Sequence, residues 1–266
     1  MLSKIYAIVT VLSTVAALAM YSAPASAQLV EGLVSYWSFD EVGTSDVVQD
    51  EVGGNDGELK GDVEVVDGYF GDAVEFNGQV GTCVEIAHDP SLALPDALTL
   101  IAWVYPGDKQ DVYVMGKSAS APRANYAWVY QYPAGPGPAV ETIWGGGNMA
   151  PWPQAFVGTA EGTVPFETWT HIAMTIDSEW GIKHYVNGEL SASLEIVGKM
   201  TTDEAPVTIG SKANCGVNFL GIIDEAGIYN RALSDDEIKL IFTSHALAVS
   251  PKGRLSTAWA AIKSIN

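Results

Sequence analysis

Short runs of apolar and β-branched residues, separated by glycine, proline, asparagine and aspartate, follow one another from Leu33 to Tyr229. The apolar positions recur at strand spacing, and the spacing of three and four residues that marks a helix is almost absent. Residues 97–105 are apolar on both faces, as in an interior strand covered by a second sheet and by loops, and residues 168–176 behave similarly. The pattern predicts an all-β fold.

Two local features refine this prediction. Within residues 182–194, two strand-like runs meet at Asn187 and Gly188, the residue pair best suited to the positive φ angles of a type I′ hairpin turn. Ser234 and Glu237 have the spacing of a capping box, and the apolar residues that follow fall on one helical face. We therefore expect one hairpin and one short C-terminal helix packed on the sandwich.

The N-terminal stretch does not belong to this pattern. A basic start at Lys4, an apolar run over residues 5–20 and a small-residue motif ending at Ala27 are typical of a secretory signal peptide cleaved before Gln28. The alternative is a retained membrane helix, which the short run and the following Pro24 disfavour. We expect a secreted, periplasmic or cell-surface protein with no membrane span after cleavage.

Three parts are therefore predicted along the chain: a signal peptide of residues 1–27, one domain of residues 28–245, and a basic tail of residues 246–266 whose role the sequence does not indicate. Export places the two cysteines in an oxidising compartment. Cys83 and Cys215 are then expected to form a disulfide, and two separate buried thiols are the alternative.

Net charge limits the class of partner. The 266 residues include 13 basic and 32 acidic side chains, for a formal charge of −19. A polyanion would be repelled, and there is no stripe of lysine and arginine to release its counterions, so nucleic acid and anionic membranes are excluded as partners. Cations and neutral polymers remain.

Motifs for catalysis are missing. Retaining glycosidases on a β-sandwich need two carboxylates about 5 Å apart, which alternating acidic residues of one strand supply. No such run occurs, and Asp224 and Glu225 are adjacent, so on a regular strand they point to opposite faces. The four histidines lack the spacing of a zinc site. The sequence predicts a non-catalytic protein; an enzyme with acids from separate strands, such as Glu75, Glu85 and Glu141, is the alternative.

Aromatic residues offer a candidate binding surface. Trp128 and Tyr130 belong to an alternating aromatic row over residues 126–132, and Trp144 and Trp152 follow near glycine and proline residues. Exposed aromatic rings can stack on the apolar faces of sugars, so these four residues are candidate glycan ligands. The alternative is that the row belongs to the core, where aromatics on one face of a sandwich strand usually lie.

Seven segments occur in one order along the chain: residues 33–41, 53–57, 69–78, 98–104, 168–174, 185–188 and 223–234. Together they resemble the LamG-like jelly-roll domains of the concanavalin A-like lectin/glucanase superfamily, over roughly residues 30–243. The resemblance implies a jelly-roll sandwich of two curved antiparallel sheets.

A calcium site also follows from this resemblance. In similar domains a structural calcium often lies where the first strand, the glycine turn and the last strand converge, which points to Asp40, Asn55 and Asp224 as ligands, with Asp56 and Glu41 as second choices. Carboxylates and carbonyls suit this hard cation. Without the resemblance, the same residues would be interpreted as solvated carboxylates in turns.

The scaffold hosts lectins, adhesion modules and glycan hydrolases, so fold alone does not assign a function. Because paired acids are missing, we expect a secreted non-catalytic module that binds a carbohydrate polymer or glycan and holds a structural calcium. The alternative is a cell-surface module that binds a protein.

Overall fold

A computed structural model of the chain describes residues 29–42, 45–108, 112–120, 123–131, 139–144, 157–195, 198–244 and 247. The predicted signal peptide lies outside the described residues, as does the predicted tail except for Leu247. Among the described residues, no helix has the length and apolar character needed to cross a bilayer.

Two antiparallel sheets of eight strands each form the domain. Sheet A consists of β1 (Leu33–Trp37), β4 (Val63–Asp67), β5 (Asp72–Asn77), β7 (Ala97–Pro106), β12 (Thr170–Asp177), β13 (Gly181–Val186), β14 (Glu189–Leu194) and β16 (Leu220–Tyr229). Sheet B consists of β2 (Val47–Val48), β3 (Gly57–Lys60), β6 (Cys83–Ile86), β8 (Val112–Ser120), β9 (Arg123–Gln131), β10 (Ala139–Trp144), β11 (Val157–Gly158) and β15 (Val207–Ile209). The described helices are η1 (Pro90–Leu92), η2 (Ala213–Cys215) and α2 (Asp235–Ser244).

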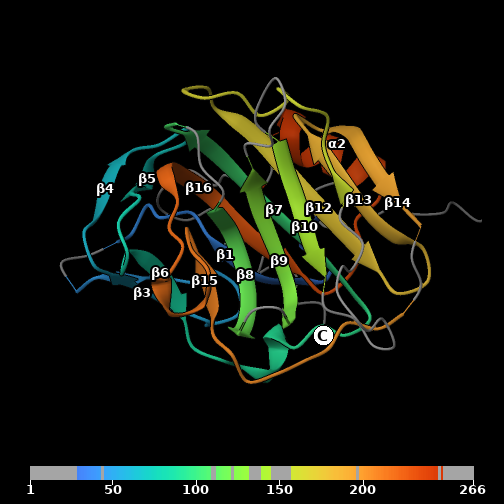
Figure 1. Cartoon of the computed structure of the whole chain (residues 1–266), viewed down its shortest axis with the longest axis horizontal. Coiled ribbons are helices and arrows are strands. Elements are labelled where there is room, and N and C mark those ends of the chain that lie inside the picture. Colours follow the sequence, from blue (N-terminus) through green and yellow to red (C-terminus); the bar gives the residue numbers. More distant parts are fainter. Residues whose placement is uncertain are drawn as a thin grey trace, which may run out of the picture.

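Strand order brings distant parts of the sequence together. Sheet A runs β14-β13-β12-β7-β16-β5-β4, with β1 also paired to β16, and sheet B runs β11-β10-β9-β8-β15-β6-β3-β2. In Figure 1, β8, β9 and β10 of sheet B cross in front of β7 and β12 of sheet A. This architecture confirms the predicted all-β jelly-roll sandwich.

The core lies between the sheets. In β7, Leu98, Leu100, Ala102 and Val104 point into it, whereas the odd-numbered residues 99–105 lie on the outer face of sheet A. Alternation of this kind follows from the two-residue period of a strand. The apolar residues on both faces of β7 are thus explained by the core on one side and by α2 and aromatic side chains on the other.

Both predicted local features are present. Asn187 and Gly188 have φ angles of 49° and 77° and join β13 to β14. At the start of α2, the Ser234 backbone N–H donates to Glu237 Oε2 (2.9 Å), and the Glu237 N–H donates to Ser234 Oγ (3.3 Å). This reciprocal pair is the predicted capping box, and the buried face of α2 then packs on the outer face of sheet A.

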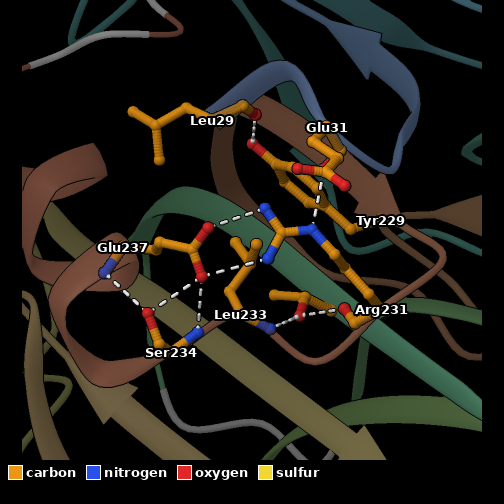
Figure 2. Close-up of polar contacts among 8 residues, drawn as sticks. Leu29, Glu31, Tyr229, Arg231, Leu233, Ser234 and Glu237 are labelled. Atoms are coloured by element: carbon orange, nitrogen blue, oxygen red, sulfur yellow. Dashed lines mark hydrogen bonds and ion pairs between the residues drawn. The ribbon is translucent and has the colours of Figure 1, made fainter. Parts of the chain in front are cut away.

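Figure 2 shows how the first described residues are fastened to the end of β16. The Tyr229 hydroxyl donates to the Leu29 carbonyl (2.9 Å), and Arg231 Nε donates to the Glu31 carbonyl (2.8 Å). The two terminal nitrogens of Arg231 donate to the Glu237 carboxylate at 3.0 and 2.7 Å. One arginine thus connects the N-terminal segment, β16 and α2.

Cys83 at the start of β6 and Cys215 in η2 form a disulfide, as predicted. The two residues are 132 positions apart. On the chain-entropy description, closing a loop of that length stabilises the fold by about 5 kcal/mol.

Candidate functional site

A β-bulge in β16 determines where its two carboxylates point. Between Asp224 and Gly227 the strand carries one residue more than β7 opposite, and Glu225 has a φ of 52°. The Asp224 carboxylate and the Glu225 carboxylate consequently both lie beside Phe70, on the outer face of sheet A. The expectation that these neighbours point to opposite faces was wrong, because it assumed a regular strand.

Asp224 is a buried carboxylate whose hydrogen bonding is incomplete. Its Oδ2 accepts from the Phe70 backbone N–H at 3.0 Å, whereas its Oδ1 has no hydrogen-bond partner among the described residues. Burial raises the pKa of Asp224 to about 7, backbone hydrogen bonds oppose the rise, and the charge of Asp40 adds to it. A buried carboxylate oxygen without a donor is costly unless a proton or a cation compensates it.

Asp40 reaches the same turn, between β4 and β5. Its Oδ1 accepts from the Asp72 N–H at 2.7 Å. A Cβ at Gly71 would lie 1.8 Å from Asp40 Oδ1, and one at Gly68 would lie 2.6 Å from Asp224 Oδ2. The two glycines therefore let both carboxylates approach the backbone of the turn closely.

Asn55 lies in a different polar network. Its Nδ2 donates to Ser35 Oγ (2.8 Å) and Ser91 Oγ (3.2 Å), and its backbone N–H donates to Asp50 Oδ2 (2.9 Å). Its carbonyl accepts from Trp37 Nε1 (3.0 Å). These contacts tie the glycine turn to β1 and η1.

Asp50 organises this turn and was missed by the sequence analysis. Its carboxylate accepts backbone N–H groups of Tyr36 (2.9 Å), Val52 (3.0 Å) and Gly53 (3.1 Å), besides that of Asn55. An aspartate just before a glycine-rich turn is the signal that could have revealed it.

Glu51 and Asp56 occupy the surroundings of these turns. Burial raises the pKa of Glu51, the charges of Asp40 and Glu41 add to the rise, and a hydrogen bond with Ser38 opposes it. Asp56 Oδ1 accepts from the Asp50 N–H at 2.8 Å.

Across the described residues, no group of three or more histidine, cysteine, aspartate or glutamate side chains is arranged to hold a metal. A cation on the β4–β5 turn would need backbone carbonyls or water besides Asp40 and Asp224.

The predicted glycan residues Trp128 and Tyr130 are not on the surface. Both side chains are fully buried in the core between the sheets, and the Tyr130 hydroxyl donates to the Val164 carbonyl (3.0 Å). The assignment was wrong for these two because the aromatic face of β9 points inward. Trp144 ends β10 with a side chain outside the described part, and Trp152 lies outside the described residues.

A different set of aromatic residues does reach the surface, on the outer face of sheet A. Tyr69 is 39% exposed and stacks on Trp103, with ring centroids 3.6 Å apart and planes at 15°. Half-buried Trp169 adjoins Tyr69 at 5.9 Å and Tyr105 at 5.6 Å. We call Tyr69, Tyr105 and Trp169 the aromatic surface.

The sequence did not reveal this surface because its residues come from three separate segments. Tyr69 belongs to the turn between β4 and β5, Tyr105 to β7, and Trp169 precedes β12. None of the three stands in a local pattern that distinguishes an exposed aromatic residue from a core one.

Two of the three glutamates considered for an enzyme, Glu85 and Glu141, lie too far apart to form a catalytic pair. Glu75 lies in sheet A, whereas Glu85 and Glu141 lie in sheet B on β6 and β10. Four inter-strand spacings, about 19 Å, separate these two strands. Glycosidase carboxylates are separated by roughly 5–9.5 Å, so this spacing does not fit either mechanism.

Comparisons with known proteins agree with the architecture. Human adhesion G-protein coupled receptor D1 is 38% identical over 114 residues, which is 39% of this chain and 12% of the receptor. The binding domain of Paraclostridial Mosquitocidal Protein 1 has a TM-score of 0.64 at 17% identity, over 82% of this chain and 53% of that one. Domain 4 of AbnA, a GH43 extracellular arabinanase from Geobacillus stearothermophilus, was solved in complex with arabinotriose. It has a TM-score of 0.59 at 21% identity, over 78% of this chain and 96% of that domain.

This chain therefore spans about half of the toxin structure and a small part of the receptor. A family model described as concanavalin A-like lectin/glucanases superfamily matches residues 77–239, more than half of the chain. The chain belongs to the concanavalin A-like lectin/glucanase superfamily.

Proposed function

We propose that this chain is an exported, non-catalytic module that binds carbohydrate through the aromatic surface. The observation that carries the proposal is the grouping of Tyr69, Tyr105 and Trp169 on the outer face of sheet A with their rings partly exposed. Sugars stack their apolar C–H faces on such rings. The similar arabinanase domain solved with arabinotriose supports this class of ligand.

Binding to an array of immobilised oligosaccharides tests the proposal. Trp169→Ala should weaken binding about tenfold, since one aromatic contact contributes roughly 0.5–1.5 kcal/mol beyond the area it covers. Trp180→Ala is the matched control, because Trp180 is 75% exposed at the turn between β12 and β13, away from the aromatic surface. If no glycan on the array is bound, the proposed carbohydrate-binding function is refuted. If Trp169→Ala and Trp180→Ala bind equally well, the proposal that the aromatic surface is the binding site is refuted.

We further propose a structural calcium ion held by Asp40 and Asp224. The buried Asp224 Oδ1 without a donor supports it, and the nearby Asp40 charge would be neutralised by the same ion. Calcium would clamp the β4–β5 turn to β16 and would take its remaining oxygens from backbone carbonyls or water. Asn55, held by Ser35 and Ser91, is left out of this ligand set.

A thermal melt with EDTA and with added calcium tests the metal. Calcium at about a hundred times its dissociation constant should raise the melting temperature by about 5–10 °C. Asp224→Asn should abolish the shift, and Asp62→Asn, at an exposed position in the β3–β4 turn, should keep it. A wild-type protein that melts at the same temperature with and without calcium would rule the ion out.

A further inference from the structure

The aromatic surface continues into a row of side chains that crosses sheet A. Ile222 of β16 pairs with Tyr105 of β7 on one side and with Glu75 of β5 on the other, and Glu75 pairs with Glu64 of β4. Directly paired residues point to the same face, so these side chains lie next to one another on the outer face. Trp169 extends the row beyond Tyr105.

One end of this row is aromatic and the other is acidic. Trp169, Tyr105 and Ile222 are half-buried, whereas Glu75 and Glu64 are exposed. Three inter-strand spacings, about 14 Å, separate the position of Trp169 from that of Glu75. One sugar ring cannot touch both ends. The row therefore fits an oligosaccharide that stacks on the rings and donates hydroxyl hydrogen bonds to the Glu75 carboxylate.

The charge of this face selects among oligosaccharides. The five strands that carry the row, β4, β5, β7, β12 and β16, contain no lysine or arginine. A sugar carboxylate or sulfate would meet Glu75 and Glu64 without a cation on these strands to pair with, within a chain of formal charge −19. Hydroxyl groups of a neutral sugar can donate to both glutamates.

We propose that the aromatic surface takes a neutral oligosaccharide that lies across the strands of sheet A from Trp169 to Glu75, and that it rejects sialylated and sulfated chains. This inference rests on the proposed function and adds the ligand class and its direction. The stacking residues give affinity at one end, and Glu75 gives the preference for uncharged sugars at the other.

The test uses an array of matched glycans, in which each neutral oligosaccharide of one to five sugars stands beside its sialylated or sulfated version. The wild-type chain should bind neutral members at least about tenfold more tightly than their anionic versions, and this preference should shrink as salt is raised. Glu75→Gln should weaken neutral binding and reduce the preference. Glu179→Gln, at the exposed turn between β12 and β13, should change neither.

Each result decides between the claims. Equal or tighter binding of anionic glycans overturns the inferred ligand class, while the proposed carbohydrate function stands. If Glu75→Gln binds neutral glycans as tightly as the wild-type chain and keeps the same preference for them, the claim that the oligosaccharide extends from Trp169 to Glu75 is overturned. Tight binding of single sugars, equal to that of longer neutral chains, overturns the same claim. An array without any bound glycan removes the function and this inference together.

Discussion

The buried Asp224 carboxyl gives the folded protein a pH dependence whose sign follows from its surroundings. Its pKa rises from 3.8 to about 7 on folding, chiefly because burial disfavours the charged form. The folded protein therefore keeps a proton that the unfolded chain has already lost. Below about pH 4 Asp224 is protonated in both states and does not destabilise the fold. As pH rises, the buried carboxyl increasingly destabilises the folded state, and this destabilisation reaches its full size above about pH 7.

The magnitude follows from the two pKa values. Relative to a neutral side chain, Asp224 costs about 2 kcal/mol of folding free energy at pH 5 and about 4 kcal/mol at pH 8. Asn mimics the protonated carboxyl in shape and hydrogen bonding. In EDTA, Asp224→Asn should therefore gain roughly 2 kcal/mol of stability relative to wild type when pH is raised from 5 to 8.

Urea unfolding of wild type and Asp224→Asn in EDTA at the two pH values measures this difference directly, since other titrating groups such as Glu225 act on both proteins. Asp62→Asn serves as the control, because Asp62 is exposed and its substitution should behave alike at both values. A stability difference between Asp224→Asn and wild type that does not change with pH would refute the reasoning. Calcium at about a hundred times its dissociation constant should narrow the stability difference between the two proteins at pH 8 by about 2.7 kcal/mol, because only the wild-type carboxylate holds the ion.

Two further predictions concern packing and the N-terminal segment. Trp128→Ala should lower the free energy of unfolding in urea by about 3–5 kcal/mol, because the ring is fully buried. The folded variant should still bind glycan, and a loss of binding would show that Trp128 contributes to the ligand site. Arg231→Ala should lower the free energy of unfolding by about 1–3 kcal/mol, because it removes the bonds to Glu237 and Glu31 in a largely shielded site. Lys239→Ala, at the exposed pair with Glu189, should leave the free energy of unfolding unchanged. Equal effects of the two variants would contradict the role of Arg231.

Most of the fold could be predicted from the sequence because its signals are local or form a long ordered set. The turn at Asn187 and Gly188 needs only the φ preferences of its own residues, and the capping box needs only Ser234 and Glu237. The disulfide could be predicted because the chain has only two cysteines and its first residues have the pattern of an export signal. None of these inferences needs the partner strands to be known.

The candidate site could be predicted only in part, because its geometry depends on pairing between distant strands. Alternation along β9 predicts that Trp128 shares a face with Tyr126 and Tyr130, but it does not predict which face of the strand the other sheet covers. Asp224 and Glu225 were separated by the same rule, which fails at a bulge. Aromatic rings that gather from three segments have no local signature at all.

The turn between β4 and β5 links the two proposed sites. Phe70 donates its N–H to Asp224 Oδ2, while Tyr69, the residue before it, presents its ring to the aromatic surface and rests on Trp103. An ion that orders the carboxylates beneath this turn also fixes the backbone from which the Tyr69 ring projects. If calcium increases glycan affinity in this way, bound glycan must increase calcium affinity by the same factor, because coupling between two binding equilibria is reciprocal. The proposed metal is then part of the sugar site through the positioning of Tyr69, without touching the sugar.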